Sequence, residues 1–212
     1  MEPTTRLTFL GIEFDTVGMT MRLPQEKLTE LQRRIHETLH TSKTTLRDLQ
    51  TIIGLLNFAS QVVVSGRAFI RRLIDATIGV KRPKHKIRVT SGMRLDLVTW
   101  LEFLNHYNGI TLFPERLWVS NDTLQFFFTD SGIFFHSKWA FGKWPKHWLD
   151  SGRLRDMTYL ELFPVVVAIL VWGQSLANLR ILFYIDNQAV LHVVNEQTSK
   201  LSEVMILVRE MV

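Results

Sequence analysis

Three stretches in the second half of the chain decide its fold: FFFTD at 126–130, TYLELFPVVVAILVW at 158–172 and RILFYIDNQAV at 180–190. The first and third are short apolar runs that lead to an aspartate, Asp130 and Asp186, and such runs are typical of buried strands. Between them lies an apolar segment of helical length that carries one acid near its start, Glu161. A carboxylate among apolar residues is costly to bury unless it is paired or binds a metal. The three acids are therefore candidates for one shared site.

Divalent-metal chemistry is what three such carboxylates suggest. Mg²⁺ prefers oxygen ligands, and a two-metal site activates water and stabilises the leaving oxygen in phosphodiester cleavage. Spacing alone does not decide the matter, because each acid also has a structural interpretation. Asp130 and Asp186 would cap the turns that follow their strands, and Glu161 would be a first-turn acid that complements the helix dipole. Both interpretations stay open at this level.

Composition excludes several classes of protein. The chain has 212 residues, is 46% hydrophobic and contains no cysteine, which rules out disulfides, zinc fingers and thiol catalysis. No secretory signal pattern is present near Met1. The most apolar segment, Leu162–Trp172, is shorter than the roughly 20 residues that span a bilayer. We therefore expect a soluble intracellular protein of the nucleus or cytoplasm, with no membrane partner.

Positive charge is concentrated in the first half of the chain. Residues 1–110 hold 16 Lys and Arg against 10 Asp and Glu, whereas residues 111–212 hold 9 against 10. A basic front half is consistent with a polyanionic partner, and equally with ordinary surface charge. The basic segment Gly79–Arg88 is the best linker candidate; it is either a solvated loop or a phosphate contact.

Periodicity predicts a small hairpin and then helices in the first half. Leu7–Phe14 is a strand candidate that a turn at Gly18 joins to Met19–Leu23. Apolar residues at helical spacing predict four helices, and Thr45 with Asp48 fits a capping box. The predicted helices are Gln25–Leu39, a second from Leu46 to about Val63, Arg67–Ala76, and a fourth capped by Ser91 that ends near His106.

Strand and helix signals alternate in the second half. The predicted strands are Leu117–Val119, Leu124–Thr129, Ile133–Phe135, Trp139–Phe141 and Ile181–Ile185. The predicted helices are Met157–Ser175, with Thr158 as a possible cap, Asn187–Asn195 and Leu201–Met211. A turn is predicted at Asn108–Gly109.

Several segments together resemble the reverse transcriptase of DIRS-type (tyrosine-recombinase) retrotransposons. FLG at 9–11 followed by RLPQEKL at 22–28 resembles the end of the polymerase palm entering the thumb. The thumb is resembled by LRDLQTIIGLLNFAS at 46–60 and GRAFIRRL at 66–73. The ribonuclease H segment is resembled by WAFGKWP at 139–145, TYLELFPVVVA at 158–168 and DNQAVLHVVNEQTSK at 186–200. The resemblance covers nearly the whole chain.

The resemblance implies an α+β or α/β fold in four parts. Residues 1–23 would be the end of the palm, 24–78 a thumb-like helical bundle, and 79–116 a basic linker with a connection helix. Residues 117–212 would be a ribonuclease H-like domain, truncated at its C-terminal end, with a mixed five-stranded sheet flanked by helices. The fingers and palm would belong to a longer polyprotein, so no polymerase activity is expected from this chain alone.

The resemblance also implies a chemistry. Asp130, Glu161 and Asp186 match metal-binding acids that use Mg²⁺ or Mn²⁺ to hydrolyse the RNA strand of an RNA–DNA hybrid. Asp130 and Asp186 would bridge the metals, and Glu161 would hold one and orient the attacking water. The basic residues expected to contact the phosphates of the duplex are Arg67, Arg71 and Arg72.

Two departures from the family pattern keep other interpretations open. Asp130-Ser131-Gly132 runs directly into the next strand, where the family has a longer Gly/Ala-rich segment. The fourth acid of the family lies on a helix later than residue 212. The alternative is a catalytically inactive nucleic-acid-binding remnant of the same element, and a third interpretation is a fragment with no selected role. The sequence leaves the enzyme status open.

Aromatic and amide residues near the acids have two interpretations each. Trp139, Trp144 and Trp148 could form a stacking platform for bases, but we expect them to pack the hairpin against the helix. Asn187 and Gln188 directly follow the third acid. They would either touch the substrate backbone or form the first turn of a helix.

Overall fold

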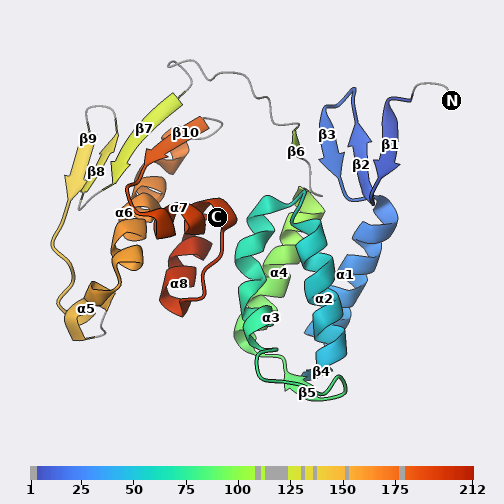
Figure 1. Ribbon diagram of the computed structural model, residues 1–212. Coiled ribbons are helices and arrows are strands. Elements are labelled where there is room, and N and C mark those ends of the chain that lie inside the picture. Colours follow the sequence, from blue (N-terminus) through green and yellow to red (C-terminus); the bar gives the residue numbers. More distant parts are fainter. Residues whose placement is uncertain are drawn as a thin grey trace. The chain divides into compact units, whose positions relative to one another are not determined.

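The computed structural model describes residues 4–107, 111–112, 124–129, 132–135, 138–150, 153–176 and 180–212. The chain divides into two compact units, Met1–Arg116 and Leu117–Val212, and each is described by itself (Figure 1). Both contain helices and small sheets, a mixed content that is compatible with the α+β class. The predicted turn at Asn108–Gly109 and the predicted strand Leu117–Val119 lie outside the described residues.

Unit 1 combines a small sheet, a helical bundle and a second, two-stranded sheet (Figure 1). Its strands are β1 (Arg6–Phe9), β2 (Ile12–Asp15), β3 (Thr20–Arg22), β4 (Lys43–Thr45), β5 (Lys86–Arg88) and β6 (Thr111–Leu112). Its helices are α1 (Gln25–Leu39), α2 (Leu46–Ala59), the 3₁₀ helix η1 (Val64–Phe69), α3 (Arg71–Asp75) and α4 (Ser91–His106). The first sheet has the order β1-β2-β3-β6, and β4 pairs only with β5 among the described strands.

The strand predicted over Leu7–Phe14 is wrong, because the chain turns back within it. Phe9 pairs with Ile12 in an antiparallel register, and the two residues between them have positive φ angles, 48° at Leu10 and 80° at Gly11. Two-residue hairpin turns with positive φ match the twist of the strands they join. The turn at Gly18 separates β2 from β3, as predicted.

The helical core of unit 1 follows the predicted periodicity. Helix α1 has the predicted bounds, and the apolar stripes of α1, α2 and α4 are turned inward. The fully buried members include Ile35, Leu49, Leu56, Leu97 and Trp100. Such burial stabilises the unit by about 1.5–3 kcal/mol for each large side chain.

Helix ends are less well predicted than helix faces. The Thr45 side chain accepts from the Asp48 N–H and caps α2, as predicted, but this helix ends at Ala59 rather than near Val63. The cap of α4 is Thr90, which accepts from the Met93 N–H, and not Ser91. The single helix predicted over Arg67–Ala76 is divided into η1 and α3.

The basic segment 79–88 is part of unit 1. Its strand β5 pairs with β4, with Lys43 opposite Arg88 and Thr45 opposite Lys86. The loop before β5 also supplies backbone acceptors to the start of α2, because Leu46 N–H donates to His85 O and Arg47 N–H to Pro83 O. These bonds satisfy N–H groups that a helix start otherwise leaves without partners.

Unit 2 is a mixed sheet with helices packed beside it (Figure 1). Its strands are β7 (Leu124–Thr129), β8 (Gly132–Phe135), β9 (Lys138–Phe141) and β10 (Arg180–Tyr184). Its helices are α5 (His147–Asp150), η3 (Arg153–Arg155), α6 (Met157–Trp172), η4 (Gly173–Leu176), α7 (Gln188–Glu196) and α8 (Ser202–Met211). The described sheet has four strands in the order β10-β7-β8-β9, whereas the resemblance implies five.

The sheet contains one parallel and two antiparallel pairings. Strands β7, β8 and β9 form an antiparallel meander, and β10 pairs with β7 in parallel. A parallel pair requires a crossover connection, and α6 lies on that connection. A buried cluster joins α6 and η4 to the sheet through Ile133, Ala168, Trp172 and Leu176.

Helix α6 is longer than its most apolar segment suggests. Its cap is Asp156, which accepts from the Tyr159 N–H, and not Thr158. With η4 it forms a 20-residue stretch, Met157–Leu176, that is long and apolar enough to cross a membrane by length and composition. The expectation from Leu162–Trp172 alone underestimated this length. Core helices of soluble proteins have the same property, so the feature is weak evidence for a membrane span.

Replacing Gly66 with alanine should destabilise unit 1. A Cβ atom there would lie 2.3 Å from ring atoms of Trp100, whose side chain is fully buried. Overpacking of this kind costs about 1–3 kcal/mol. Amide hydrogen exchange of the unit 1 helices would measure the loss.

The matched control is Gly54→Ala in α2, where a Cβ would meet nothing within 4 Å. This change should stabilise the helix by about 0.5–1 kcal/mol. Equal effects of the two substitutions would contradict the close approach of Gly66 to Trp100.

Asp15 should contribute to the acid sensitivity of the first sheet. A hydrogen bond from the Gly18 N–H, with further bonds from Arg6 and the Val17 N–H, holds the pKa of Asp15 below its ordinary value of 3.8, although burial opposes the shift. Its stabilising contribution is therefore complete above that ordinary value and is lost as the pH falls through the lowered pKa.

Substitution of Asp15 by asparagine tests this linkage. The amide oxygen can still accept the two backbone bonds, but the ion pair with Arg6 is lost. Hydrogen exchange of the first sheet should show lower stability at neutral pH and a smaller further loss on acidification. The control Glu102→Gln changes an exposed carboxylate of α4 and should leave the acid-induced loss as in the wild type.

Candidate functional site

Two of the candidate acids follow the two parallel strands of unit 2. The pairing of β7 with β10 has Phe128 opposite Tyr184. Two positions further along each sequence come Asp130 and Asp186. Asp130 itself lies outside the described residues. Asp186 is described, and its side chain is exposed.

Glu161 lies on the inward stripe of α6. Residues 161, 165, 168 and 172 share one face of a helix because of its 3.6-residue period, and Val165, Ala168 and Trp172 are all buried. The Oε2 atom of Glu161 is also buried and has no hydrogen-bond partner among the described residues. The helix has no acid in its first turn, so the interpretation of Glu161 as a first-turn acid is wrong.

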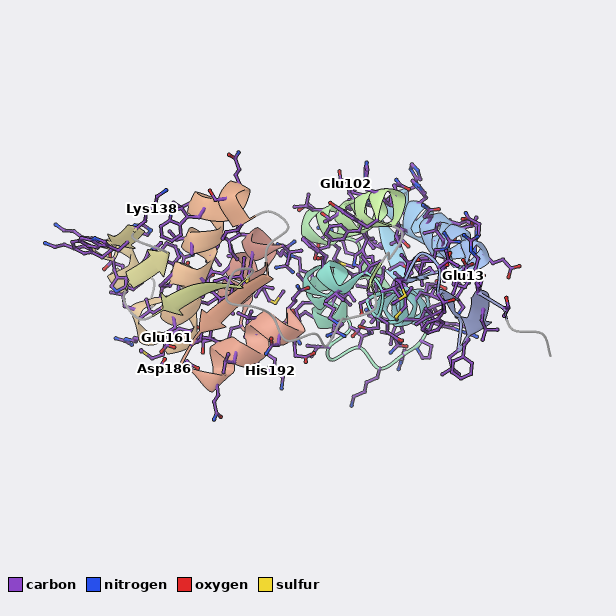
Figure 2. The ribbon with its side chains drawn as sticks, turned by 90° about the horizontal axis from the view of Figure 1, so that it is seen from above. Glu13, Glu102, Lys138, Glu161, Asp186 and His192 are labelled. Carbon is purple, nitrogen blue, oxygen red and sulfur yellow. The ribbon has the colours of Figure 1, made fainter. Side chains whose placement is uncertain are left out.

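Ideal helix and strand rises would place Glu161 and Asp186 at comparable heights along the sheet. Three residues separate Leu176, the end of η4, from Arg180, the start of β10. From Leu176, Glu161 is about 24 Å back, at 1.5 Å per residue in α6 and 2.0 Å per residue in the 3₁₀ helix η4. From Arg180, Asp186 is about 20 Å forward along the strand direction at 3.3 Å per residue. Figure 2 labels both side chains on the same side of unit 2.

A divalent cation is the group that this pair of acids could hold. Hard cations take carboxylate oxygens, and a buried acceptor without a partner calls for an unseen ion or water. The buried Oε2 of Glu161 therefore fits a metal ligand. The described residues contain no group of three His, Cys, Asp or Glu arranged to hold a metal, a search that does not include Asp130.

Asn187 has a structural role beside this site. Its side-chain oxygen accepts from the N–H groups of Ala189 and Val190 and caps α7. Of the two interpretations of Asn187, the helix start is the one that the contacts support. Gln188 is the first residue of α7 and is exposed.

Arg71 and Arg72, two of the arginines proposed to bind phosphate, form ion pairs within unit 1. Arg72 pairs with Asp96 at 2.6 Å, and the Asp96 side chain is completely buried. Arg71 pairs with Asp75 at 2.7 Å and is itself only 18% exposed. Arg67 lies in η1 and is partly buried. The sequence did not single out Asp96, because the residue is 24 positions from its partner and no local pattern links the two.

The tryptophans divide between packing and surface. Trp148 is buried and packs edge-on against Phe163 of α6, and Trp144 stacks on Trp148, as expected for packing. Trp139 is 67% exposed and stacks on the exposed Phe141 with their ring centroids 5.2 Å apart. The packing interpretation is therefore wrong for this residue.

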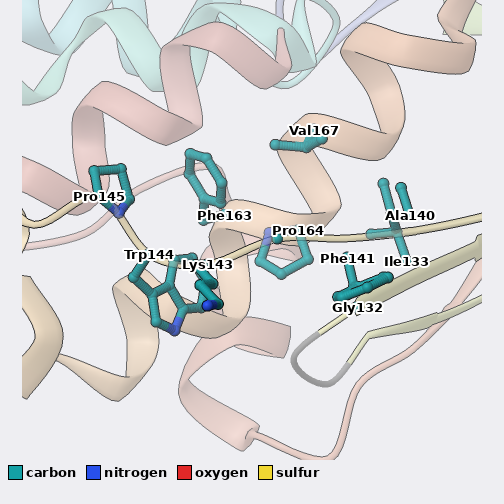
Figure 3. Close-up of a pocket in the computed structure, with 11 residues that line it drawn as sticks. Gly132, Ile133, Ala140, Phe141, Lys143, Trp144, Pro145, Phe163, Pro164 and Val167 are labelled. Carbon is teal, nitrogen blue, oxygen red and sulfur yellow. The ribbon is translucent and has the colours of Figure 1, made fainter.

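An apolar pocket of about 350 Å³ lies between β8, β9 and α6 (Figure 3). Its lining includes Phe141, Trp144, Phe163 and Pro164, and the described lining residues include no acid. Glu161 and Asp186 are not among its lining residues. The pocket is therefore separate from the carboxylate site.

Arg72→Ala should destabilise unit 1 strongly, because it leaves the buried Asp96 without its ion-pair partner. Loss of one member of a buried pair costs about 3–5 kcal/mol, and we expect the lower end because the Arg72 side chain is 36% exposed. Hydrogen exchange of unit 1 would measure the change. The control Arg33→Ala removes ion pairs on the exposed face of α1 and should cost less than about 1 kcal/mol; similar losses for both would count against a structural role for Arg72.

Comparisons with known proteins leave the interpretation to the residues themselves. No protein-family model, no curated protein and no solved structure matches the chain. The case for a function therefore rests on the geometry above and on the sequence resemblance.

Proposed function

We propose that unit 2 is a ribonuclease H-like, divalent-metal-dependent hydrolase that cleaves the RNA strand of RNA–DNA hybrids. The observation that carries the proposal is the buried, unpartnered Oε2 of Glu161, on a helix beside two parallel strands that each lead to an aspartate. An acceptor left without a partner costs about 1–3 kcal/mol, and more when it is charged. A metal ligand explains why such a group stands in an otherwise apolar helix.

The topology of unit 2 supports the same proposal. The resemblance implies a mixed sheet flanked by helices, and the described sheet is mixed, with α6 packed against it. The short connection after Asp130 does not prevent the first hairpin, since Thr129 pairs with Ile133 across it. The strand order alone does not define the activity, because one fold serves many functions.

The proposed roles follow from the chemistry of the three acids. Asp130 and Asp186 would supply oxygen ligands from adjacent strands, and Glu161 would supply a third from α6 and orient the attacking water. When bound, divalent ions activate that water and stabilise the leaving oxygen of the phosphodiester. The buried side of Glu161 excludes solvent from one face of the site, which strengthens electrostatic interactions there.

The proposed substrate is recognised through its backbone. Helices of the A-form type display 2′-hydroxyls in a wide, shallow minor groove, and proteins bind them mainly by shape and by phosphate and hydroxyl contacts. An RNA–DNA hybrid, rather than either single-type duplex, is what the family resemblance implies. The alternative function is binding of the same nucleic acid without cleavage, and the basic charge of the first half of the chain favours it.

Cleavage of a labelled RNA–DNA hybrid in Mg²⁺ or Mn²⁺ tests the proposal. The wild-type chain should cleave the RNA strand, and Asp130→Asn, Glu161→Gln and Asp186→Asn should each lower the rate by at least about 100-fold, because even partners outside the ligand shell cost 10–100-fold. The control Asp150→Asn changes an exposed acid of α5 and should retain the wild-type rate. Binding without cleavage would support the alternative, and equal rates for all variants would refute the metal site.

Metal binding gives a readout that does not depend on activity. Mn²⁺ should raise the unfolding temperature of wild-type unit 2, because a ligand that binds only the folded state stabilises it. Without metal, Glu161→Gln should leave that temperature unchanged or raise it, because the substitution removes the charge of a half-buried carboxylate that has one buried oxygen without a partner among the described residues. With Mn²⁺, the same variant should lose most of the metal-induced shift.

A further inference from the structure

The two-stranded sheet of β4 and β5 and the segments beside it carry a group of exposed cations. The group, here called the basic patch, comprises seven residues of β4, the first turn of α2, β5 and the loop that precedes β5: Lys43, Arg47, Lys81, Arg82, Lys84, Lys86 and Arg88. All seven side chains are exposed. None of them forms an ion pair within residues 4–107, the described part of unit 1 apart from β6.

The backbone holds these cations in place. Lys43 pairs with Arg88 and Thr45 with Lys86 across the two strands, and His85 and Pro83 bond to the start of α2. The alternate residues Ile87 and Val89 are buried. Because side chains alternate along a strand, burial of Ile87 turns Lys86 and Arg88 toward the solvent together.

The arrangement is unfavourable for the isolated chain. Like charges directly opposite one another on antiparallel strands are destabilising, and Lys43 faces Arg88 in this way. The start of α2 adds the positive end of a helix dipole to the same region. Two acids lie nearby: Asp48 bonds to the neutral Thr45 hydroxyl and keeps its charge, whereas Glu37 pairs with Arg33. They offset only a small part of the seven positive charges.

We propose that the basic patch is a docking surface for the phosphate backbone of a nucleic-acid duplex. Phosphate contacts from Lys and Arg supply affinity that does not depend on sequence. This surface differs from Arg71 and Arg72, whose guanidinium groups are held by Asp75 and Asp96. It is also distinct from the start of α2 itself, because the Leu46, Arg47 and Asp48 N–H groups already have acceptors within the chain.

Side-chain chemistry favours nucleic acid over an anionic membrane. Proteins that lie on membranes combine basic residues with apolar side chains that enter the lipid. The apolar side chains at β5, Ile87 and the neighbouring Val89, are instead buried. Ile78 is 68% exposed, but it precedes the basic patch in the chain. Binding to a membrane is therefore included as an outcome of the test.

The inference deepens the proposed function by naming a surface that binds the proposed substrate. It rests on that function only for the choice of a hybrid duplex as the ligand. Its test is therefore a binding measurement in EDTA, where no cleavage can occur. Loss of cleavage in the Asp186→Asn variant with intact binding would leave this inference standing. Duplex binding that does not depend on the basic patch would overturn the inference even if the chain cleaves RNA.

The experiment compares two variants of the full chain that lose the same three charges. The test variant is Lys84→Gln/Lys86→Gln/Arg88→Gln. The control is Arg6→Gln/Lys27→Gln/Arg33→Gln, whose residues lie on β1 and α1, outside the basic patch. Fluorescence anisotropy of a labelled RNA–DNA hybrid duplex would give the dissociation constant at several salt concentrations. Vesicles with and without phosphatidylserine would be measured in parallel, and circular dichroism would establish that both variants fold.

For the test variant we expect the dissociation constant to rise by at least about tenfold at low salt. The slope of the logarithm of affinity against the logarithm of salt concentration should fall by about one for each contact removed. The control should keep most of the wild-type affinity and slope. Equal losses in both variants would reduce the effect to net charge and overturn the proposal, as would binding only to phosphatidylserine vesicles.

Discussion

The parallel pairing of β7 with β10 is the constraint on which unit 2 depends. Parallel strands cannot be joined by a tight turn and need a crossover, which here contains α6. Because only a short connection joins η4 to β10, the early part of α6 is carried back toward the ends of the strands. By ideal rises, this pairing would bring Glu161, far from Asp186 in the sequence, to a comparable height along the sheet. The candidate site would then be a consequence of that crossover and would need no long loop to assemble it.

Helix α6 breaks two local rules at this same place. Glu161 leaves a buried oxygen without a partner, and Pro164, three residues later, lies inside the helix, where it removes an N–H that would bond to the preceding turn. Neither residue is what stability alone would select for an apolar core helix. Natural chains keep such departures mainly at functional or strained sites. Their occurrence within one turn of each other argues that this part of α6 is shaped by something other than packing.

The sequence predicted what has a period and missed what depends on distant partners. The stripes of α1 and α4 and the strand β7 follow from apolar spacing alone, and Glu161 was found because a lone carboxylate breaks such a stripe. Segment 79–88 was interpreted as a linker because its pairing with β4 joins Lys43 to Arg88, which no local pattern reveals. The turn at Leu10–Gly11 was missed for another reason, since a leucine with positive φ gives no sign in the sequence. Arg72 could be counted as a cation, but its buried partner Asp96 could not be foreseen.

Charged side chains at the proposed sites differ in their surroundings between the two units, and this difference affects how each unit would bind a ligand. In unit 1, arginines that stabilise the bundle are held by acids, as Arg72 is by Asp96, whereas the basic patch faces solvent. If a duplex binds the basic patch, as proposed, binding and folding would depend on different residues, and affinity could change without loss of the fold. In unit 2 the carboxylate of Glu161 belongs to the core stripe itself, so an ion bound there would relieve a cost that folding incurs. Metal binding should then be coupled to the stability of unit 2, while duplex binding by unit 1 should depend on salt and not on metal.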